Sequence, residues 1–170
     1  MTDLKSGVNP LFLREEELRR GLELMFYAYR DFTAEADAIL AGYGLGRAHH
    51  RVIYFVGRYP GITVSRLLGI LKITKQSLSR VMGELVEQDL VAARPGPSDR
   101  RQRLLGLTDK GGALERELSG VQMRRVAGAY REAGAEAVEG FRRVMMGVMN
   151  PDDRVRFEEA PPAPPRRTVG

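Results

Sequence analysis

The chain has 170 residues, of which 43% are hydrophobic, with no cysteine and a net charge of +5. This length suits one domain, or two small units that share a core. The lack of cysteine excludes disulfides, thiolate nucleophiles and Cys-ligated zinc. No apolar run approaches the length of a membrane span, and residues 1–15 lack an apolar stretch with a cleavage site. We therefore expect a soluble, cytoplasmic protein without a membrane partner.

The first part of the chain predicts one long amphipathic helix. Asn9-Pro10 has the composition of a helix start, and the acidic run 15–17 follows where the helix dipole favours negative charge. Apolar residues then recur every three or four positions as far as Gly42, which indicates a heptad seam on a helix of about 30 residues. The seam suits a dimer interface as well as an internal core. It consists of Leu18, Leu22, Met25, Tyr29, Phe32, Ala36 and Ile39.

The middle of the chain predicts three shorter helices and a hairpin. The helices cover residues 46–58, 64–71 and 75–88, and Thr63 and Thr74 are placed to cap the second and the third. The pattern then changes to two short extended runs, 91–94 and 102–107, joined by a Gly/Pro-rich turn. Such a pair of strands predicts a β-hairpin.

The C-terminal part predicts two more helices and a tail. Thr108 is placed to cap a helix that runs to about residue 133, and Gly134 separates it from a helix over 135–149 that Asn150-Pro151 ends. Residues 158–170 are proline-rich and of low complexity, so we expect them to be disordered, whereas 151–157 are ambiguous.

Excess positive charge is concentrated in one quarter of the chain. Residues 63–103 carry 8 basic and 4 acidic side chains, whereas residues 1–62 and 151–170 are each neutral overall. A localised basic block is typical of a surface that binds nucleic acid, although a solvated basic face has the same composition. Charge alone leaves both interpretations open.

The order of elements in this basic block favours nucleic-acid binding. Two short helices, a tight turn between them and a following hairpin are the parts of a winged helix-turn-helix, whose second helix enters the DNA major groove. An ordinary amphipathic surface helix is the alternative, and the basic hairpin makes it less favoured. The donor-rich side of the second helix carries Thr74, Lys75, Gln76, Ser77, Ser79 and Arg80. Thr63 and Arg66 are candidates for phosphate contacts.

Residues 74–108, TKQSLSRVMGELVEQDLVAARPGPSDRRQRLLGLT, resemble the DNA-binding core of the MarR (multiple antibiotic resistance regulator) family. The resemblance in layout covers roughly residues 10–150. It implies a mainly α fold with a small β-hairpin wing, in which N- and C-terminal helices intertwine in an obligate dimer. It also implies that Arg101 enters the minor groove, that Arg100 contacts phosphate, and that Asp99 holds the wing by pairing with arginine. Arg103 belongs to the same wing.

On this resemblance the chain has four parts. These are an N-terminal dimerisation helix over 1–45, a winged lobe over 46–108, C-terminal dimerisation helices over 109–150 and a largely disordered tail over 151–170. The family usually has glycine after the recognition helix, where this chain has Asp89. Because aspartate tolerates the left-handed conformation better than most residues, we expect the turn to survive.

The resemblance further implies an effector pocket between the dimer helices and the winged lobe. The candidates for its lining are Tyr27, Tyr29, His50 and Tyr54, which could equally be packing residues. The adjacent His49 and His50 point about 100° apart on a helix, so we expect no metal site. We also expect no cofactor.

These observations together predict a non-enzymatic protein, because no G-x-S-x-G, P-loop or H-E-x-x-H motif occurs. We expect a homodimeric, sequence-specific regulator of transcription, a ligand-responsive repressor that binds a pseudo-palindromic operator in double-stranded DNA. A ligand-independent architectural or accessory DNA-binding protein is the alternative. A third interpretation is a protein-interaction module that has lost DNA binding. The presence of Arg80, Asp99 and Arg101 argues against it.

Overall fold

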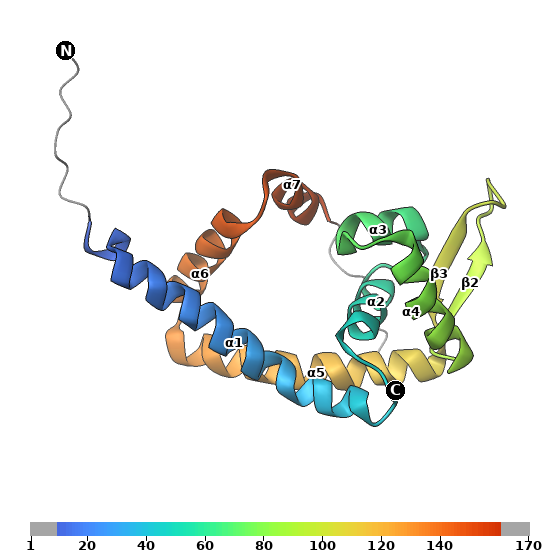
Figure 1. Cartoon of the computed structure of the whole chain (residues 1–170), viewed down its shortest axis with the longest axis horizontal. Helices are drawn as coiled ribbons and strands as arrows, with labels where there is room; N and C mark the ends of the chain where they lie inside the picture. Colours follow the sequence, from blue (N-terminus) through green and yellow to red (C-terminus); the bar gives the residue numbers. More distant parts are fainter. Residues whose placement is uncertain (1–9, 161–170) are drawn as a thin grey trace, which may run out of the picture.

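The computed structural model describes residues 10–160, which form seven α-helices, one 3₁₀ turn and a small antiparallel sheet (Figure 1). Two long helices, α1 (Glu15–Ala41) and α5 (Asp109–Ala133), lie side by side and are joined by an ion pair of 3.0 Å between Arg125 and Glu35. The winged lobe lies at one end of this pair. None of the described helices is both long and apolar enough to cross a membrane.

The winged lobe contains three helices and three strands. Its order is α2 (Arg47–Arg58), β1 (Ile62–Thr63), α3 (Val64–Leu71), α4 (Lys75–Glu87), β2 (Val91–Pro95) and β3 (Arg103–Leu107). In the sheet β3 is central, with Val91 opposite Leu107 on one side and Ile62 opposite Leu105 on the other. The hairpin prediction is therefore confirmed, whereas β1 was not expected because two residues are too few for a visible alternation.

Threonine caps fix the starts of three helices, as predicted. The hydroxyl oxygens of Thr63, Thr74 and Thr108 each accept the backbone N–H three residues later, at 3.2, 3.1 and 3.0 Å. Each bond satisfies an amide that the first turn of a helix leaves without a partner. These caps fix the residues at which α3, α4 and α5 begin.

One hydrophobic core joins the lobe to the long helices. Leu40 of α1, Ile53 of α2, Leu67 of α3, Leu85 of α4 and Leu118 of α5 are all fully buried. Burial of side chains of this size contributes about 1.5–3 kcal/mol each. The lobe is therefore packed on the long helices and not merely tethered to them.

The start of the first helix was predicted wrongly. Pro10 precedes only a single 3₁₀ turn, Leu11–Leu13, and Arg14 is extended, with φ −66° and ψ 146°. The α-helix begins at Glu15, so that the run 15–17 occupies its first turn, where the dipole favours carboxylates. The acidic run thus marks the start, and the predicted cap Asn9 lies outside the described residues.

The expected disorder of the tail is wrong for residues 158–159, and residues 151–157, which the sequence pattern left ambiguous, are helical too. After α6 (Ala135–Val148), these residues form a further helix, α7 (Pro151–Glu159). The dipeptide Asn150-Pro151 ends one helix and also starts the next, since proline suits the first helical position. An ion pair of 2.6 Å between Asp153 and Lys72 joins α7 to the end of α3. Residues 161–170 lie outside the described range.

Candidate nucleic-acid interface

The second helix of the helix-turn-helix, α4, presents a polar surface. Leu78, Val81 and Leu85 bury one side of it, and the predicted recognition residues lie exposed on the rest. Those residues are Thr74, Lys75, Gln76, Ser77, Ser79 and Arg80. The positive end of the helix dipole, at Thr74, adds a site suited to phosphate. The structure thus brings all six residues to one accessible surface at the N-terminal part of the helix.

The hairpin tip is shaped by Gly96 and Asp99. The amide of Gly96 donates to the carbonyl oxygen of Gln102 at 2.9 Å. The amide of Gln102 in turn donates to the carbonyl oxygen of Asp99 at 3.1 Å. A Cβ on Gly96 would lie 2.8 Å from the carbonyl oxygen of Asp99, so a larger residue would force the tip open. The exposed wing residues Arg100, Arg101 and Arg103 follow this turn.

The expected role of Asp99 needs a correction. Its carboxylate accepts the backbone N–H of Arg101 at 2.9 Å, two residues on, and none of the ion pairs found within residues 10–160 joins Asp99 to a guanidinium group. An aspartate side chain is short, and bonding its own chain two residues on is its usual behaviour in turns. Asp99 therefore orders the wing backbone.

The two predicted phosphate-contact residues lie at the start of α3. Thr63 accepts the amide of Arg66 and keeps its own hydroxyl hydrogen for another acceptor. The guanidinium of Arg66 lies over the ring of Tyr59, 4.8 Å from its centroid, which fixes the direction of this exposed cation. Figure 1 places α3, α4 and the hairpin at the same end of the molecule.

The turn after α4 is left-handed, as expected. Asp89 has φ 58°, and the carbonyl oxygen of Asp89 accepts the hydroxyl of Thr108 at 2.6 Å. Lys110 donates to the neighbouring carbonyl of Gln88 at 2.7 Å. The end of α4 is therefore held against the start of α5, which connects the candidate interface with the long helices.

One contact of the recognition helix was missed by the sequence analysis. Glu84 bonds Arg80 within α4 at 3.2 Å and His49 of α2 at 2.5 Å. The i,i+4 spacing of Arg80 and Glu84 is a visible signal. Nothing in the sequence indicates that His49 joins them.

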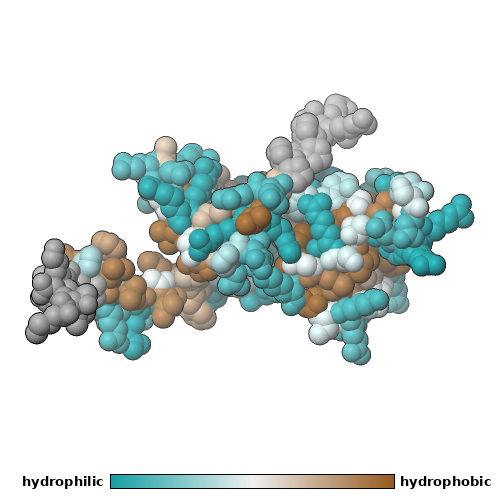
Figure 2. Space-filling view, turned by 90° about the horizontal axis from the view of Figure 1, so that it is seen from above, coloured by the Kyte–Doolittle hydropathy of each residue, from teal (hydrophilic) through white to brown (hydrophobic). Residues whose placement is uncertain are grey.

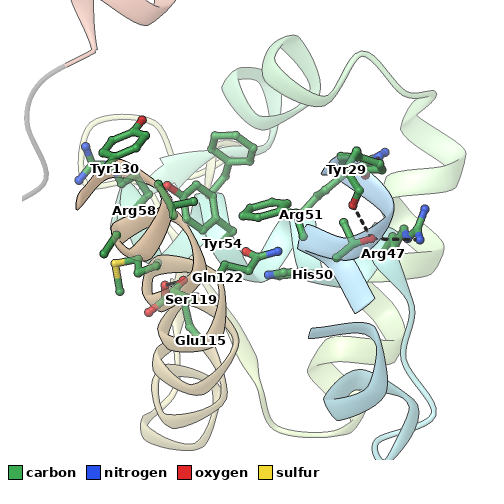
Figure 3. A pocket seen from close by; sticks show the side chains of 17 residues that line it. Tyr29, Arg47, His50, Arg51, Tyr54, Arg58, Glu115, Ser119, Gln122 and Tyr130 are labelled. Carbon is green, nitrogen blue, oxygen red and sulfur yellow. Dashed lines mark hydrogen bonds between the residues drawn. The ribbon is translucent and has the colours of Figure 1, made fainter. Parts of the chain in front are cut away.

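A cavity of about 960 Å³ opens between α1, α2 and α5 (Figure 3). Three of the four predicted effector-pocket residues line it, namely Tyr29, His50 and Tyr54. Tyr27 is not among its lining residues, because two positions along a helix, about 200° of rotation, turn it away from Tyr29. It lies instead beside Phe26 and Arg30. Further lining comes from the aromatic and apolar residues Phe32, Phe55, Met123, Val126 and Tyr130.

The charged lining of the cavity, which the sequence analysis missed, is mainly basic. Arg47, Arg51 and Arg58 contribute positive charge and Glu115 negative charge. Arg47 is paired with Asp37 at 2.9 Å, and the Oε1 atom of Glu115 accepts the hydroxyl of Ser119 at 2.5 Å. Burial lowers the pKa of His50, which keeps its imidazole neutral at neutral pH.

Metal coordination finds no support in the part of the chain that the structure describes, because no three histidine, aspartate or glutamate side chains of residues 10–160 meet in a suitable cluster. The features of the lobe are instead those of a helix-turn-helix followed by a basic wing. The exposed donors of α4 and the arginines of the hairpin define a winged helix-turn-helix protein.

Comparison with known proteins assigns the family. The model of the MarR family matches residues 43–102. The HTH-type transcriptional regulator PetP of Rhodobacter capsulatus is 50% identical over 157 residues, which cover 92% of this chain and 95% of PetP. The chain therefore belongs to the MarR family.

Solved structures share the fold. Streptococcus pneumoniae FabT in complex with DNA matches with a TM-score of 0.68 and 17% identity, over 84% of this chain and 97% of FabT. A cysteine-to-serine mutant of MarR from E. coli, complexed with operator DNA, matches with a TM-score of 0.61 and 20% identity, over 82% and 99% of the two chains. This chain therefore has the same fold as these two proteins, both of which were solved in complex with DNA.

Proposed function

We propose that this protein is a sequence-specific, DNA-binding regulator of transcription. One observation carries the proposal: the donor-rich surface of α4 and the basic tip of the β2–β3 hairpin lie at the same end of a winged lobe. The helix suits a major groove, and the arginines of the tip suit the adjacent minor groove. The naming of PetP as a transcriptional regulator and the DNA complexes of two structural neighbours support the same function.

The regulator acts as a homodimer in this proposal. Large apolar side chains in the N-terminal half of α1 and on α6 lie open to solvent. Figure 2 shows hydrophobic residues, mixed with hydrophilic ones, at the end of the molecule away from the wing. Leu22, Phe26 and Phe141 are 68%, 63% and 50% exposed. Apolar patches of this kind mark interfaces, and a second copy of the chain offers the same patch by symmetry. Residues 1–45 and 109–150 then supply the dimerisation helices.

A dimer presents two recognition helices to one operator. For a symmetric helix-turn-helix dimer, the half-sites of a pseudo-palindrome lie about 10 base pairs apart. In this arrangement Thr74, Lys75, Gln76, Ser77, Ser79 and Arg80 contact the major groove. Arg100, Arg101 and Arg103, ordered by Asp99, contact the minor groove and the backbone, and Thr63 and Arg66 contact phosphates.

The cavity between α1, α2 and α5 is the proposed effector pocket of a ligand-responsive repressor. Its aromatic walls suit a ring, and the excess of arginine over glutamate suits a negative charge. The effector class is therefore a small aromatic anion. Bound between the lobe and the long helices, such a ligand would change the population of lobe positions that fit DNA.

Recovery of bound genomic DNA tests the function. The experiment sequences fragments bound by the full chain and maps them by footprinting. A single protected pseudo-palindrome upstream of a gene supports the regulator. Uniform coverage without a shared sequence contradicts it and supports the alternative, an architectural or accessory DNA-binding protein that needs no ligand.

A further inference from the structure

His49 connects α2 to the recognition helix through a buried ring. Only 8% of His49 is exposed, and its Nδ1 atom accepts the amide of Gly46 at 3.0 Å. The Nδ1 lone pair is therefore occupied, so in the neutral ring the hydrogen must lie on Nε2. The Nε2 atom lies 2.5 Å from the Oε2 atom of Glu84. The local backbone of α2 thus fixes which ring nitrogen donates to α4.

Glu84 has both carboxylate oxygens in use. Oε2 accepts from His49, and Oε1 accepts the Nη1 hydrogen of Arg80 at 3.2 Å. The hydrogen bond from His49 lowers the pKa of Glu84, so the carboxylate stays charged at neutral pH. Because one oxygen is held by α2, the other has a fixed direction. A carboxylate attached only to the surface of α4 would rotate freely.

Arg80 is the cation that this carboxylate restrains. Its side chain is 68% exposed and lies on the proposed DNA-reading surface of α4. An exposed arginine has several rotatable bonds, and reading guanine with two hydrogen bonds requires one orientation of the guanidinium plane. Restraint before binding lowers the entropy lost on binding. It also favours the base whose edge fits the restrained orientation.

We propose that His49 is a positioning residue for DNA recognition, which orients Arg80 through Glu84 and so sets the base preference of the recognition helix. This inference rests on the proposed function, since it requires that Arg80 reads a base. His49 does not touch DNA in this arrangement. It acts from the core side of the helix, two side chains from the nucleic acid.

Two substitutions separate this role from the structural role of His49. In His49→Asn, the side-chain oxygen can accept a hydrogen bond from the Gly46 amide as Nδ1 does, but the side chain is too short to reach Glu84. In His49→Gln, the side-chain amide lies near the position of Nε2 and can donate to Glu84.

The substitution Glu84→Gln tests the same connection independently. Its control is Glu87→Gln, which changes the net charge equally on the exposed part of α4. Arg80→Ala removes the reading group itself.

The probe is a duplex that the wild-type chain selects from a random-sequence pool. Each variant is measured by competition against single-base changes in that duplex, and its melting temperature is recorded separately. We expect Arg80→Ala to lose about tenfold discrimination at one base position. His49→Asn and Glu84→Gln lose about threefold or more at the same position, whereas His49→Gln and Glu87→Gln keep it. In an Arg80→Ala background, His49→Asn has no further effect.

Three results overturn the inference. One is an unchanged base preference in both His49→Asn and Glu84→Gln. Another is a loss of base discrimination by His49→Asn that persists in the Arg80→Ala background. That result would assign the effect of His49 to packing. The last is an unchanged preference in Arg80→Ala, which removes Arg80 from the reading set. In that last case the proposed function fails only if the wild-type chain also selects no common sequence from the pool.

Discussion

Gly111, in the first turn of α5, lies directly against the carbonyl group of Leu90. A Cβ on Gly111 would overlap the carbonyl oxygen of Leu90 and would lie 2.8 Å from the carbonyl carbon of Leu90. The same oxygen accepts the amide of Thr108 at 3.1 Å. The start of α5 can therefore meet the turn after the recognition helix only if residue 111 has no side chain.

Gly111→Ala should destabilise the protein by about 2 kcal/mol or more, because the clash is with backbone that cannot rotate away. The matched control is Gly112→Ala. A Cβ there meets only the flexible end of Arg116, at 3.4 Å, and alanine favours a helix, so we expect a gain of up to about 1 kcal/mol. Guanidinium unfolding curves measure both free energies. Equal effects of the two substitutions would contradict the close contact.

Local chemistry made most helix limits predictable from the sequence. Thr63, Thr74 and Thr108 cap their helices through bonds that span only three residues, so the signal lies in the adjacent sequence. The start of α1 failed because Arg14, which carries no capping side chain, takes the position before it. The winged lobe could be predicted since its motifs follow each other along the chain.

Contacts between distant residues could not be predicted. His49 and Glu84 are 35 residues apart, and Lys72 and Asp153 are 81 apart. Each pair meets only because whole helices pack in a particular register, which depends on the summed burial of many side chains. For the same reason the arginines of the cavity were missed, since Arg47, Arg51 and Arg58 look like an ordinary solvated helix face in the sequence.

Asp89 offers a site for stabilisation. Its φ of 58° strains any residue with a side chain, and glycine adopts this conformation freely. We expect Asp89→Gly to raise the free energy of unfolding by up to about 1 kcal/mol, and Asp89→Val to lower it by more than about 1 kcal/mol, because β-branched residues fit this region worst. Thermal or urea unfolding compares the two variants. A loss of stability in Asp89→Gly would show that the carboxylate contributes more than the strain costs.

Leu22 tests the dimer. It lies in the seam of α1 and is 68% exposed in the single chain, so Leu22→Glu should leave the fold of the chain intact. In a dimer the new carboxylate would be buried without a partner, which costs several kcal/mol. We expect sedimentation velocity to show a dimer for the wild type and a monomer for the variant. A wild-type monomer, or a variant that remains dimeric, contradicts the proposed seam.

Arg101 tests the wing. It is exposed at the hairpin tip, and its hydrogen bond to Asp99 is made by the backbone amide, so Arg101→Ala should leave the melting temperature unchanged. Loss of one cation inserted in the minor groove should weaken operator binding about tenfold and reduce the slope of log affinity against log salt by about one. Arg116→Ala removes an equal charge from the exposed side of α5 and serves as the control. Equal binding by Arg101→Ala and the wild type in an electrophoretic shift assay would remove the wing from the interface.

His50 should make stability depend on pH in the weakly acidic range. Burial lowers its pKa from 6.5, the carboxylates of Asp37 and Glu115 oppose this change, and Arg51 reinforces it. The unfolded chain then binds a proton more readily than the folded chain does. The stability contributed by neutral His50 is therefore complete above about pH 6.5 and is lost as the pH falls through the lower folded value.

His50→Gln removes this titration and changes no other ionisable group. Unfolding free energies measured at about pH 5 and about pH 7.5 should differ less in the variant than in the wild type, since only the wild type must protonate a half-buried ring. An equal pH dependence in both proteins would show that solvent reaches the ring freely. In that case water occupies the part of the cavity beside His50, and an anionic effector would have to displace it before it could contact the ring.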